Sequence, residues 1–135
     1  MSGHRSTPLP LMCQHCDEPP CVDACPNGGF RKRAEDGVVV HDAGSCMQCL
    51  ECMGACPYGA IQMDSASGTI GKCDLCERLV NRGQAPACVA ACPMDALQLV
   101  WLDECEVPVV ALRALPDPAH AEPSLRVRPH RHGTT

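Results

Sequence analysis

The chain has 135 residues, of which 13 are cysteine, and it contains only one Phe, one Tyr and one Trp. So many thiols and so few large side chains distinguish it from an ordinary globular domain, because little is available to fill an apolar core. The formal net charge of −5 argues against a nucleic-acid-binding role, since binding phosphates requires a basic face. No apolar run is long enough to span a membrane.

An odd number of cysteines fits a disulfide framework poorly. The first twelve residues lack the apolar core of a secretory signal, so we expect synthesis in the cytoplasm, where clustered cysteines indicate metal or catalysis. Twelve of the thirteen cysteines form three groups, each ending in Cys-Pro. The groups are Cys13-x2-Cys16-x4-Cys21-x3-Cys25, Cys46-x2-Cys49-x2-Cys52-x3-Cys56 and Cys73-x2-Cys76-x11-Cys88-x3-Cys92. Similar residues follow each group, which indicates an internal repeat of a small unit.

The segments between the groups predict an α+β fold of the small bacterial ferredoxin type, with short hairpins and helical turns around the cysteines. Residues 30–33 and 38–41 flank an Asp-Gly turn and are expected to form a hairpin, and residues 60–63 and 69–71 a smaller one. Residues 75–84 predict a helical turn that ends near Gly83, and residues 96–102 a strand packed on the metal sites. Tyr58 and Trp101 are expected to pack nearby.

The spacing of the second group is typical of a bacterial ferredoxin, in which three cysteines bind one cubane and the cysteine before proline binds the other. Applied here, this pattern predicts two [4Fe–4S] clusters. The first would be bound by Cys13, Cys16, Cys21 and Cys56, and the second by Cys25, Cys46, Cys49 and Cys52. Zinc is the alternative, but a zinc ribbon takes its four ligands from two separated knuckles, whereas the second group supplies four cysteines within eleven residues.

These motifs resemble the iron–sulfur B subunit of membrane-associated molybdopterin oxidoreductases of the dimethyl sulfoxide, polysulfide and thiosulfate reductase kind. The resemblance covers roughly residues 8 to 102, and the eleven-residue gap in the third group is its most diagnostic feature. It implies an electron-transfer subunit that connects a molybdopterin-containing catalytic subunit with a quinol-facing membrane anchor. Such a subunit has no substrate chemistry of its own and is associated with the membrane through its partners, on a side that the sequence does not indicate.

The resemblance also implies ligand roles for the third group, and here the chain departs from the family. Family members usually have a further cysteine group upstream, which exchanges its fourth cysteine with the last group. A third cluster at Cys73, Cys76, Cys88 and Cys92 is therefore conditional. Three explanations stay open: Cys92 closes its own cluster, Cys105 or a partner supplies a ligand, or the chain is a shortened version of a longer protein. Otherwise Cys105 is expected to be a plain thiol.

Residues 8–105 are thus expected to form the [4Fe–4S] domain and residues 106–135 a Pro-, Arg- and His-rich tail that contacts a partner or is disordered. The cluster charge requires compensation, for which Lys72 and residues 31–33 are candidates, although solvated hairpin charge is the simpler interpretation of residues 31–33. His15 is expected to be a hydrogen-bonding neighbour of the cluster sulfurs. The alternative functions are a free-standing soluble polyferredoxin and a non-redox zinc protein.

Overall fold

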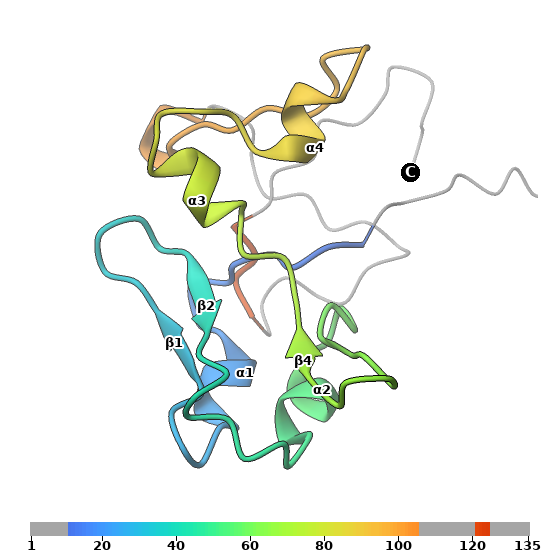
Figure 1. Cartoon of the computed structure of the whole chain (residues 1–135). Coiled ribbons are helices and arrows are strands. Elements are labelled where there is room, and N and C mark those ends of the chain that lie inside the picture. Colours follow the sequence, from blue (N-terminus) through green and yellow to red (C-terminus); the bar gives the residue numbers. More distant parts are fainter. Residues whose placement is uncertain (1–10, 106–120, 125–135) are drawn as a thin grey trace, which may run out of the picture.

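The structure is a computed structural model that describes residues 11–105 and 121–124. Short helices and two small antiparallel sheets make up this part of the chain (Figure 1), in agreement with the expected ferredoxin-type α+β layout. In chain order the elements are α1 (Pro20–Asp23), β1 (Phe30–Lys32), β2 (Val39–His41), α2 (Glu51–Ala55), β3 (Gln62–Met63), β4 (Ile70–Gly71), α3 (Glu77–Val80), α4 (Ala87–Ala90) and the 3-10 turn η1 (Leu102–Glu104).

Both expected hairpins are confirmed, with strands shorter than the sequence patterns suggest. In the first, β1 pairs with β2 so that Phe30 lies opposite His41. In the second, β3 pairs with β4 so that Met63 lies opposite Ile70. Each turn ends on a glycine with a left-handed backbone, Gly37 and Gly68, which is the conformation that glycine adopts without steric cost.

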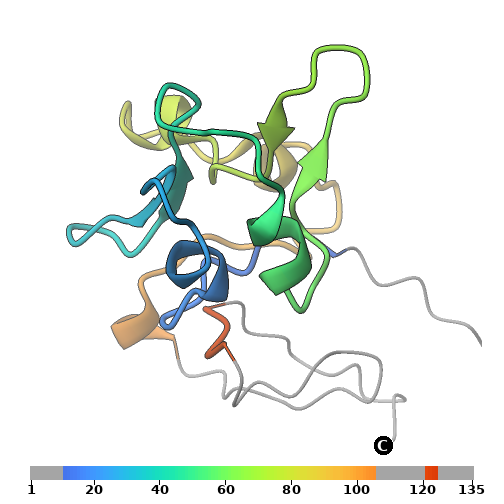
Figure 2. The ribbon, with the colours of Figure 1, turned by 90° about the horizontal axis from the view of Figure 1, so that it is seen from below.

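The helices α1 and α2 pack against each other, and α1 also packs against β1. Figure 2 shows the two helices side by side, with the β1–β2 hairpin on one side and the β3–β4 hairpin on the other. The core between them is small, and cysteines belong to it. Its buried residues are Cys21, Phe30, Val39, Cys52, Ile61 and Ile70. Apolar packing and the cysteine sites therefore share the same interior.

The helical turn expected over residues 75–84 is confirmed as α3, and the chain leaves it through Gly83, whose φ is +71°. The strand expected over residues 96–102 is wrong. Residues 96–101 form no regular element, Val100 is 49% exposed and Trp101 is 61% exposed. A strand needs a neighbouring edge to satisfy its backbone groups, and both described sheets are two-stranded hairpins whose strands pair only with each other.

Residues 121–124 lie against the loop of the first cysteine group, and Figure 2 shows this short segment beside α1. The rest of the tail predicted over residues 106–135 falls outside the described residues. Within the described part of the chain, no helix combines the length and the apolar character needed to cross a membrane.

Candidate metal centre

The three cysteine groups share one backbone geometry in their Cys-x2-Cys loops. In each loop the residue before the second cysteine has a left-handed backbone, with φ of +44° at His15, +57° at Gln48 and +57° at Leu75. None of these residues is glycine, so each conformation costs free energy that the rest of the loop must offset. The sequence repeat is therefore also a structural repeat.

A second shared feature follows the cysteine that precedes proline. The residue three positions later is left-handed in every group, with φ of +65° at Gly28, +58° at Gly59 and +48° at Asp95. This turn directs the next backbone N–H at the cysteine sulfur. Gly29 donates to Cys25 Sγ at 3.1 Å, Ala60 to Cys56 Sγ at 3.5 Å and Ala96 to Cys92 Sγ at 3.3 Å. Such donors favour the thiolate, which is the form that binds metal.

The cysteines predicted for the first cluster line one cavity. Cys13 and Cys16 come from the first loop, Cys21 from α1, and Cys56 from the end of α2. The cavity holds about 340 Å³ of empty space, part of it open to solvent, and its wall is otherwise mostly apolar, with Val39, Tyr58 and Ile61 among its lining residues. Four thiols around one partly open cavity are a donor set that suits an iron–sulfur cluster.

Burial sets the acidity of this first site. Burial first, and the charge of Cys13 second, raise the pKa of Cys16 to about 11 and that of Cys21 to about 12. These thiols are thus protonated at neutral pH until metal displaces the protons. Lys72 is the cation that lines the cavity, and its ammonium group donates to the carbonyl oxygens of Val39 and Cys73.

The second set is more open. Cys25 and Cys46 meet at Gly29, where an added Cβ would lie 3.5 Å from Cys25 Sγ and 3.4 Å from Cys46 Cα. Burial raises the pKa of Cys52, and the charges of Cys46 and Cys49 raise it further, which indicates that these three cysteines are neighbours. Cys49 is exposed.

The pKa of Cys25 shifts in the opposite direction. Burial acts to raise it, but the backbone N–H groups of residues 27–30 outweigh this effect and lower the pKa below the ordinary thiol value. The pKa of Cys25 thus shifts opposite to that of Cys52, and the N–H group of Gly29, which donates to Cys25 Sγ, is one of the donors responsible.

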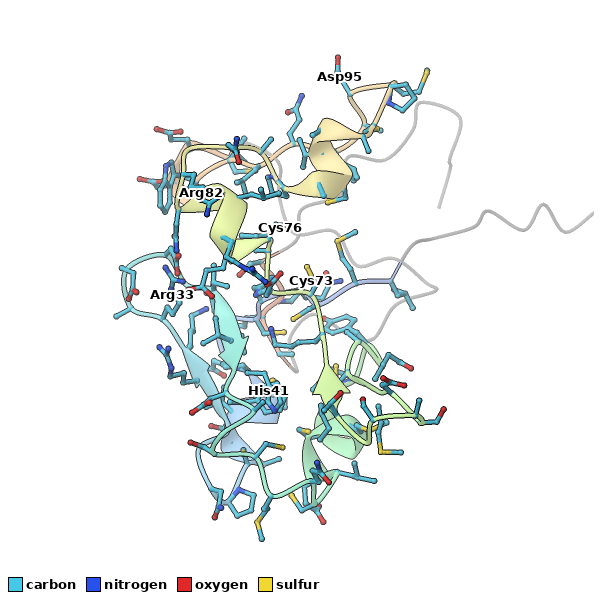
Figure 3. The ribbon with its side chains drawn as sticks, viewed as in Figure 1. Arg33, His41, Cys73, Cys76, Arg82 and Asp95 are labelled. Carbon is cyan, nitrogen blue, oxygen red and sulfur yellow. The ribbon has the colours of Figure 1, made fainter. Side chains whose placement is uncertain are left out.

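The third group is only partly assembled. Burial raises the pKa of Cys73, and Cys13 is among the charges that raise it further, so the third group begins next to the first site. Figure 3 shows Cys73 and Cys76 on the chain that leads from the hairpins to α3. Cys88 is exposed on α4 and Cys92 follows it; no described hydrogen bond or packing cluster joins either to Cys73. Among the described residues, no three or more Cys, His, Asp or Glu side chains are grouped as a single metal ion would require.

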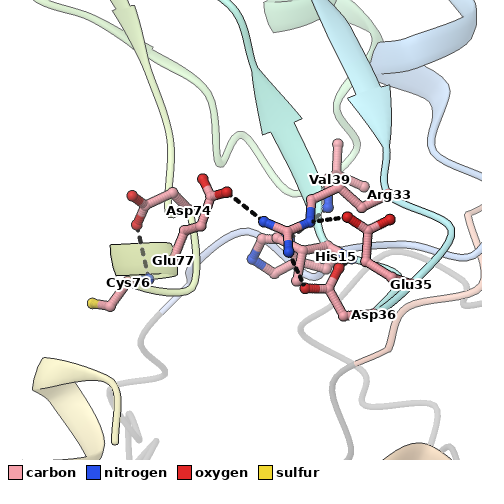
Figure 4. Close-up of polar contacts among 9 residues, drawn as sticks. His15, Arg33, Glu35, Asp36, Val39, Asp74, Cys76 and Glu77 are labelled. Carbon is pink, nitrogen blue, oxygen red and sulfur yellow. Dashed lines mark hydrogen bonds and ion pairs between the residues drawn. The ribbon is translucent and has the colours of Figure 1, made fainter. Parts of the chain in front are cut away.

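Two of the three basic residues of the first hairpin, Lys32 and Arg33, form specific contacts, which corrects for these two the interpretation favoured from sequence; Arg31 is exposed. Lys32 pairs with Asp17 at 2.9 Å and donates to the carbonyl oxygen of Cys16 at 2.8 Å. The side chain of Arg33 is only 10% exposed. It pairs with Glu35 at 3.2 Å, with Asp36 at 2.8 Å and with Glu77 at the start of α3 (Figure 4). Arg33 thus joins the hairpin to the third group.

His15 is 7% exposed, and its Nδ1 accepts a hydrogen bond from the backbone N–H of Val39 at 3.1 Å. The Nε2 atom is buried and has no partner among the described residues. Burial lowers the pKa of His15 to about 4, with smaller contributions from Lys72 and Lys32. The imidazole is therefore neutral at physiological pH, and the accepting Nδ1 leaves the proton on Nε2.

Tyr58 is a packing residue as predicted from the sequence, since it is buried and lines the first cavity. The same prediction is wrong for Trp101, which is exposed.

The contact of residues 121–124 with the first cysteine loop was missed in the sequence analysis. Their short polar sequence gives no signal of contact with a cysteine loop more than 100 residues away.

The fold, the repeated loops and the shared sulfur cavity define an iron–sulfur protein of the ferredoxin type. The protein belongs to the 4Fe-4S dicluster domain family, whose model matches residues 5–101.

Curated relatives agree with this assignment. The chain is 38% identical over 125 residues to YnfG, a probable anaerobic dimethyl sulfoxide reductase chain of Escherichia coli, in an alignment that covers 90% of this chain and 60% of the relative. It is 42% identical over 98 residues to thiosulfate reductase electron transfer subunit PhsB of Salmonella typhi (72% and 50%), and 44% identical over 94 residues to the B subunit of sulfite dehydrogenase from Allochromatium vinosum (65% and 39%). The chain thus spans about 60% of the length of the dimethyl sulfoxide reductase relatives. The resemblance stated from the sequence is confirmed.

Proposed function

We propose that this chain is an electron-transfer subunit of an oxidoreductase complex, relaying electrons between a molybdopterin-containing catalytic subunit and a quinol-facing membrane anchor. The observation that carries the proposal is the cavity lined by Cys13, Cys16, Cys21 and Cys56, because it joins two cysteine groups in the crossed pattern of a two-cluster ferredoxin. The names of the relatives, which include a thiosulfate reductase electron transfer subunit, support the same role.

In this proposal Cys13, Cys16, Cys21 and Cys56 hold the first cluster and Cys25, Cys46, Cys49 and Cys52 the second. A bound [4Fe–4S] cluster supplies one-electron redox chemistry. The chain itself surrounds the clusters with apolar side chains and directs backbone N–H groups at Cys25 and Cys56. The ammonium group of Lys72 lines the first cavity and is positioned to tune the reduction potential, whereas the expected contact of His15 with the cluster sulfurs stays a prediction.

A third cluster at Cys73, Cys76, Cys88 and Cys92 is the conditional part of the proposal. Cys73 lies beside the first site, which would continue the row of clusters, whereas Cys88 and Cys92 stand apart from it. A partner segment or an upstream cysteine group would supply what this group lacks. The chain performs no substrate chemistry in this scheme, because every cysteine of the three groups is used as a ligand.

The test is the content of iron, acid-labile sulfide and zinc in protein purified without oxygen, together with reversible bleaching by dithionite. We expect about eight iron and eight sulfide per chain if two clusters form, and about twelve of each if the third group also closes. A dithionite-reducible chromophore is expected in both cases. Zinc in place of iron would exclude electron transfer.

Separating a complex subunit from a free-standing polyferredoxin needs a second measurement. The tagged chain is isolated from cells grown under anaerobic respiration and the co-purifying proteins are identified by mass spectrometry. We expect a molybdopterin-containing subunit in stoichiometric amount, whereas a monodisperse chain on its own would favour the polyferredoxin.

A further inference from the structure

The loop of the first cysteine group is held by a segment that lies far away in the sequence. The backbone N–H of Ser124 donates to the carbonyl oxygen of Gln14 at 3.0 Å, and its hydroxyl donates to the carbonyl oxygen of His15 at 2.7 Å. In return, the N–H of Asp17 donates to the carbonyl oxygen of Glu122 at 2.8 Å. Glu122 has φ of +42°, so this segment adopts an unfavourable backbone in making the contact.

The same segment also contributes to the interior of the first site. Ala121 is fully buried and packs in one cluster with Cys16 and Tyr58, both of which line the first cavity. From the other direction, Lys32 binds the carbonyl oxygen of Cys16. Each of residues 14–17 therefore has a hydrogen-bond partner from a distant part of the chain.

The matching loop of the second group has no such cover. Within residues 11–105 and 121–124, no distant segment forms a hydrogen bond with residues 46–50. Met47 is 58% exposed and Cys49 is exposed, whereas their counterparts in the first loop, Gln14 and Cys16, are 4% and 8% exposed. The two loops thus differ in burial although they belong to one repeat, and residues 121–124 lie on the more buried loop, that of the first cysteine group.

We propose that residues 121–124 act as a strap that closes the first cluster site, with Ser124 as the positioning residue for its Cys-x2-Cys loop. This inference rests on the proposed assignment of a cluster to Cys13, Cys16, Cys21 and Cys56. The strap keeps water and small reagents away from that cluster, so the first cluster is retained longer than the second. Solvent exposure is one of the quantities that set a cluster's potential, so the strap also acts on the potential of the first site.

The experiment compares the two sites within one molecule. Cluster-loaded protein, purified without oxygen, is exposed to a ferrous-iron chelator and N-ethylmaleimide, and the labelled cysteines are followed over time by peptide mass spectrometry. We expect Cys13, Cys16 and Cys21 to be labelled more slowly than Cys46, Cys49 and Cys52 in the unmodified chain. Ser124→Ala removes the hydroxyl group that binds His15 and should accelerate labelling of the first set several-fold, with the second set unchanged.

A second variant, Ala121→Gln, places a larger uncharged side chain where there is no space and should displace the strap. It should accelerate labelling further and raise the midpoint potential of one cluster, measured by EPR-monitored titration, because water stabilises the reduced, more negative cluster. The matched controls are Ser65→Ala and Ala66→Gln, on the exposed β3–β4 turn, which should change neither quantity.

Equal labelling of the two sets in the unmodified chain would overturn the strap, and so would variants that accelerate both sets alike or neither. If the unmodified chain nevertheless contained the expected iron and sulfide, the proposed electron-transfer function would still hold. A chain that takes up no cluster at all would overturn both proposals, so the two failures are distinguishable.

Discussion

At the scale of single residues, the site depends on backbone conformations that only some side chains tolerate. Two of the three turns that direct an N–H at a cysteine sulfur use glycine at the left-handed position, and the third uses Asp95. Asp and Asn are the residues that tolerate this conformation best after glycine, so Asp95 in place of glycine preserves the turn in the third group. The sequence repeat alone does not explain why these positions are Gly, Gly and Asp. The left-handed φ that all three share explains it.

Gly59→Ala tests this requirement at the first site. A Cβ at residue 59 would meet no atom within 4 Å, so any loss comes from the left-handed φ of +58° and not from a clash. We expect a cost of about 1–2 kcal/mol and a lower temperature for loss of the cluster's visible absorbance on heating.

The matched control for this prediction is Gly54→Ala, inside α2. This residue is also free of contacts with an added Cβ, and its φ is not left-handed. Because alanine is the better helix former, the control should be stabilised by about 0.5–1 kcal/mol. Equal effects of the two substitutions would contradict the backbone explanation.

At the scale of elements, charged contacts connect parts of the fold that have little apolar packing between them. α3 has no fully buried residue, and Arg33 on the first hairpin contacts Glu77 at the start of that helix. The position of the third cysteine group relative to the hairpin thus depends partly on one guanidinium group.

Arg33→Met should loosen this connection. The acidic partners are partly exposed, Glu77 to 42% of its side chain, so solvent screening limits the effect to about 1 kcal/mol. We expect faster amide hydrogen exchange over residues 73–92 and little change over α1 and α2. Arg31→Met, at an exposed position on the same hairpin, is the control. Unchanged exchange over α3 would show that other contacts hold the third group.

The elements also show where sequence reasoning succeeds. Both hairpins and α3 were predictable because local signals determine them: short strand-like runs, Asp-Gly or Ser-Gly turns, and a glycine at the helix end. The strand over residues 96–102 was predicted from composition alone, and it fails because a strand needs a partner that local sequence cannot supply. The ion pair between Arg33 and Glu77 was missed for the same reason, since Glu77 is 44 residues away.

At the scale of the whole molecule, several of the proposed metal ligands are also core residues. Cys21 and Cys52 belong to the buried core with four apolar residues, and Cys16 to the smaller cluster with Tyr58 and Ala121. A protein with so little other apolar material obtains much of its folding free energy from ligation. The spacing predicts a crossed pairing of cysteine groups, and Cys13, Cys16, Cys21 and Cys56 do line one cavity. The different burial of the two sites could not be predicted, because it depends on residues 121–124.

Removal of the metal should therefore unfold the chain. We expect the metal-free, reduced protein to show no cooperative thermal transition by circular dichroism, and the transition to return after reconstitution with iron and sulfide. The raised pKa values of Cys16 and Cys21 imply that reconstitution releases protons. A sharp transition in the metal-free protein would refute this prediction.

The contacts of residues 14–17 have a consequence for the order in which the protein is completed during synthesis. This loop leaves the ribosome before its partners Lys32 and Val39, and well before residues 122–124. The cysteines of the loop are therefore synthesised long before the segment that covers them. We expect the first site to stay accessible to the machinery that inserts iron and sulfide until residues 121–124 have been translated.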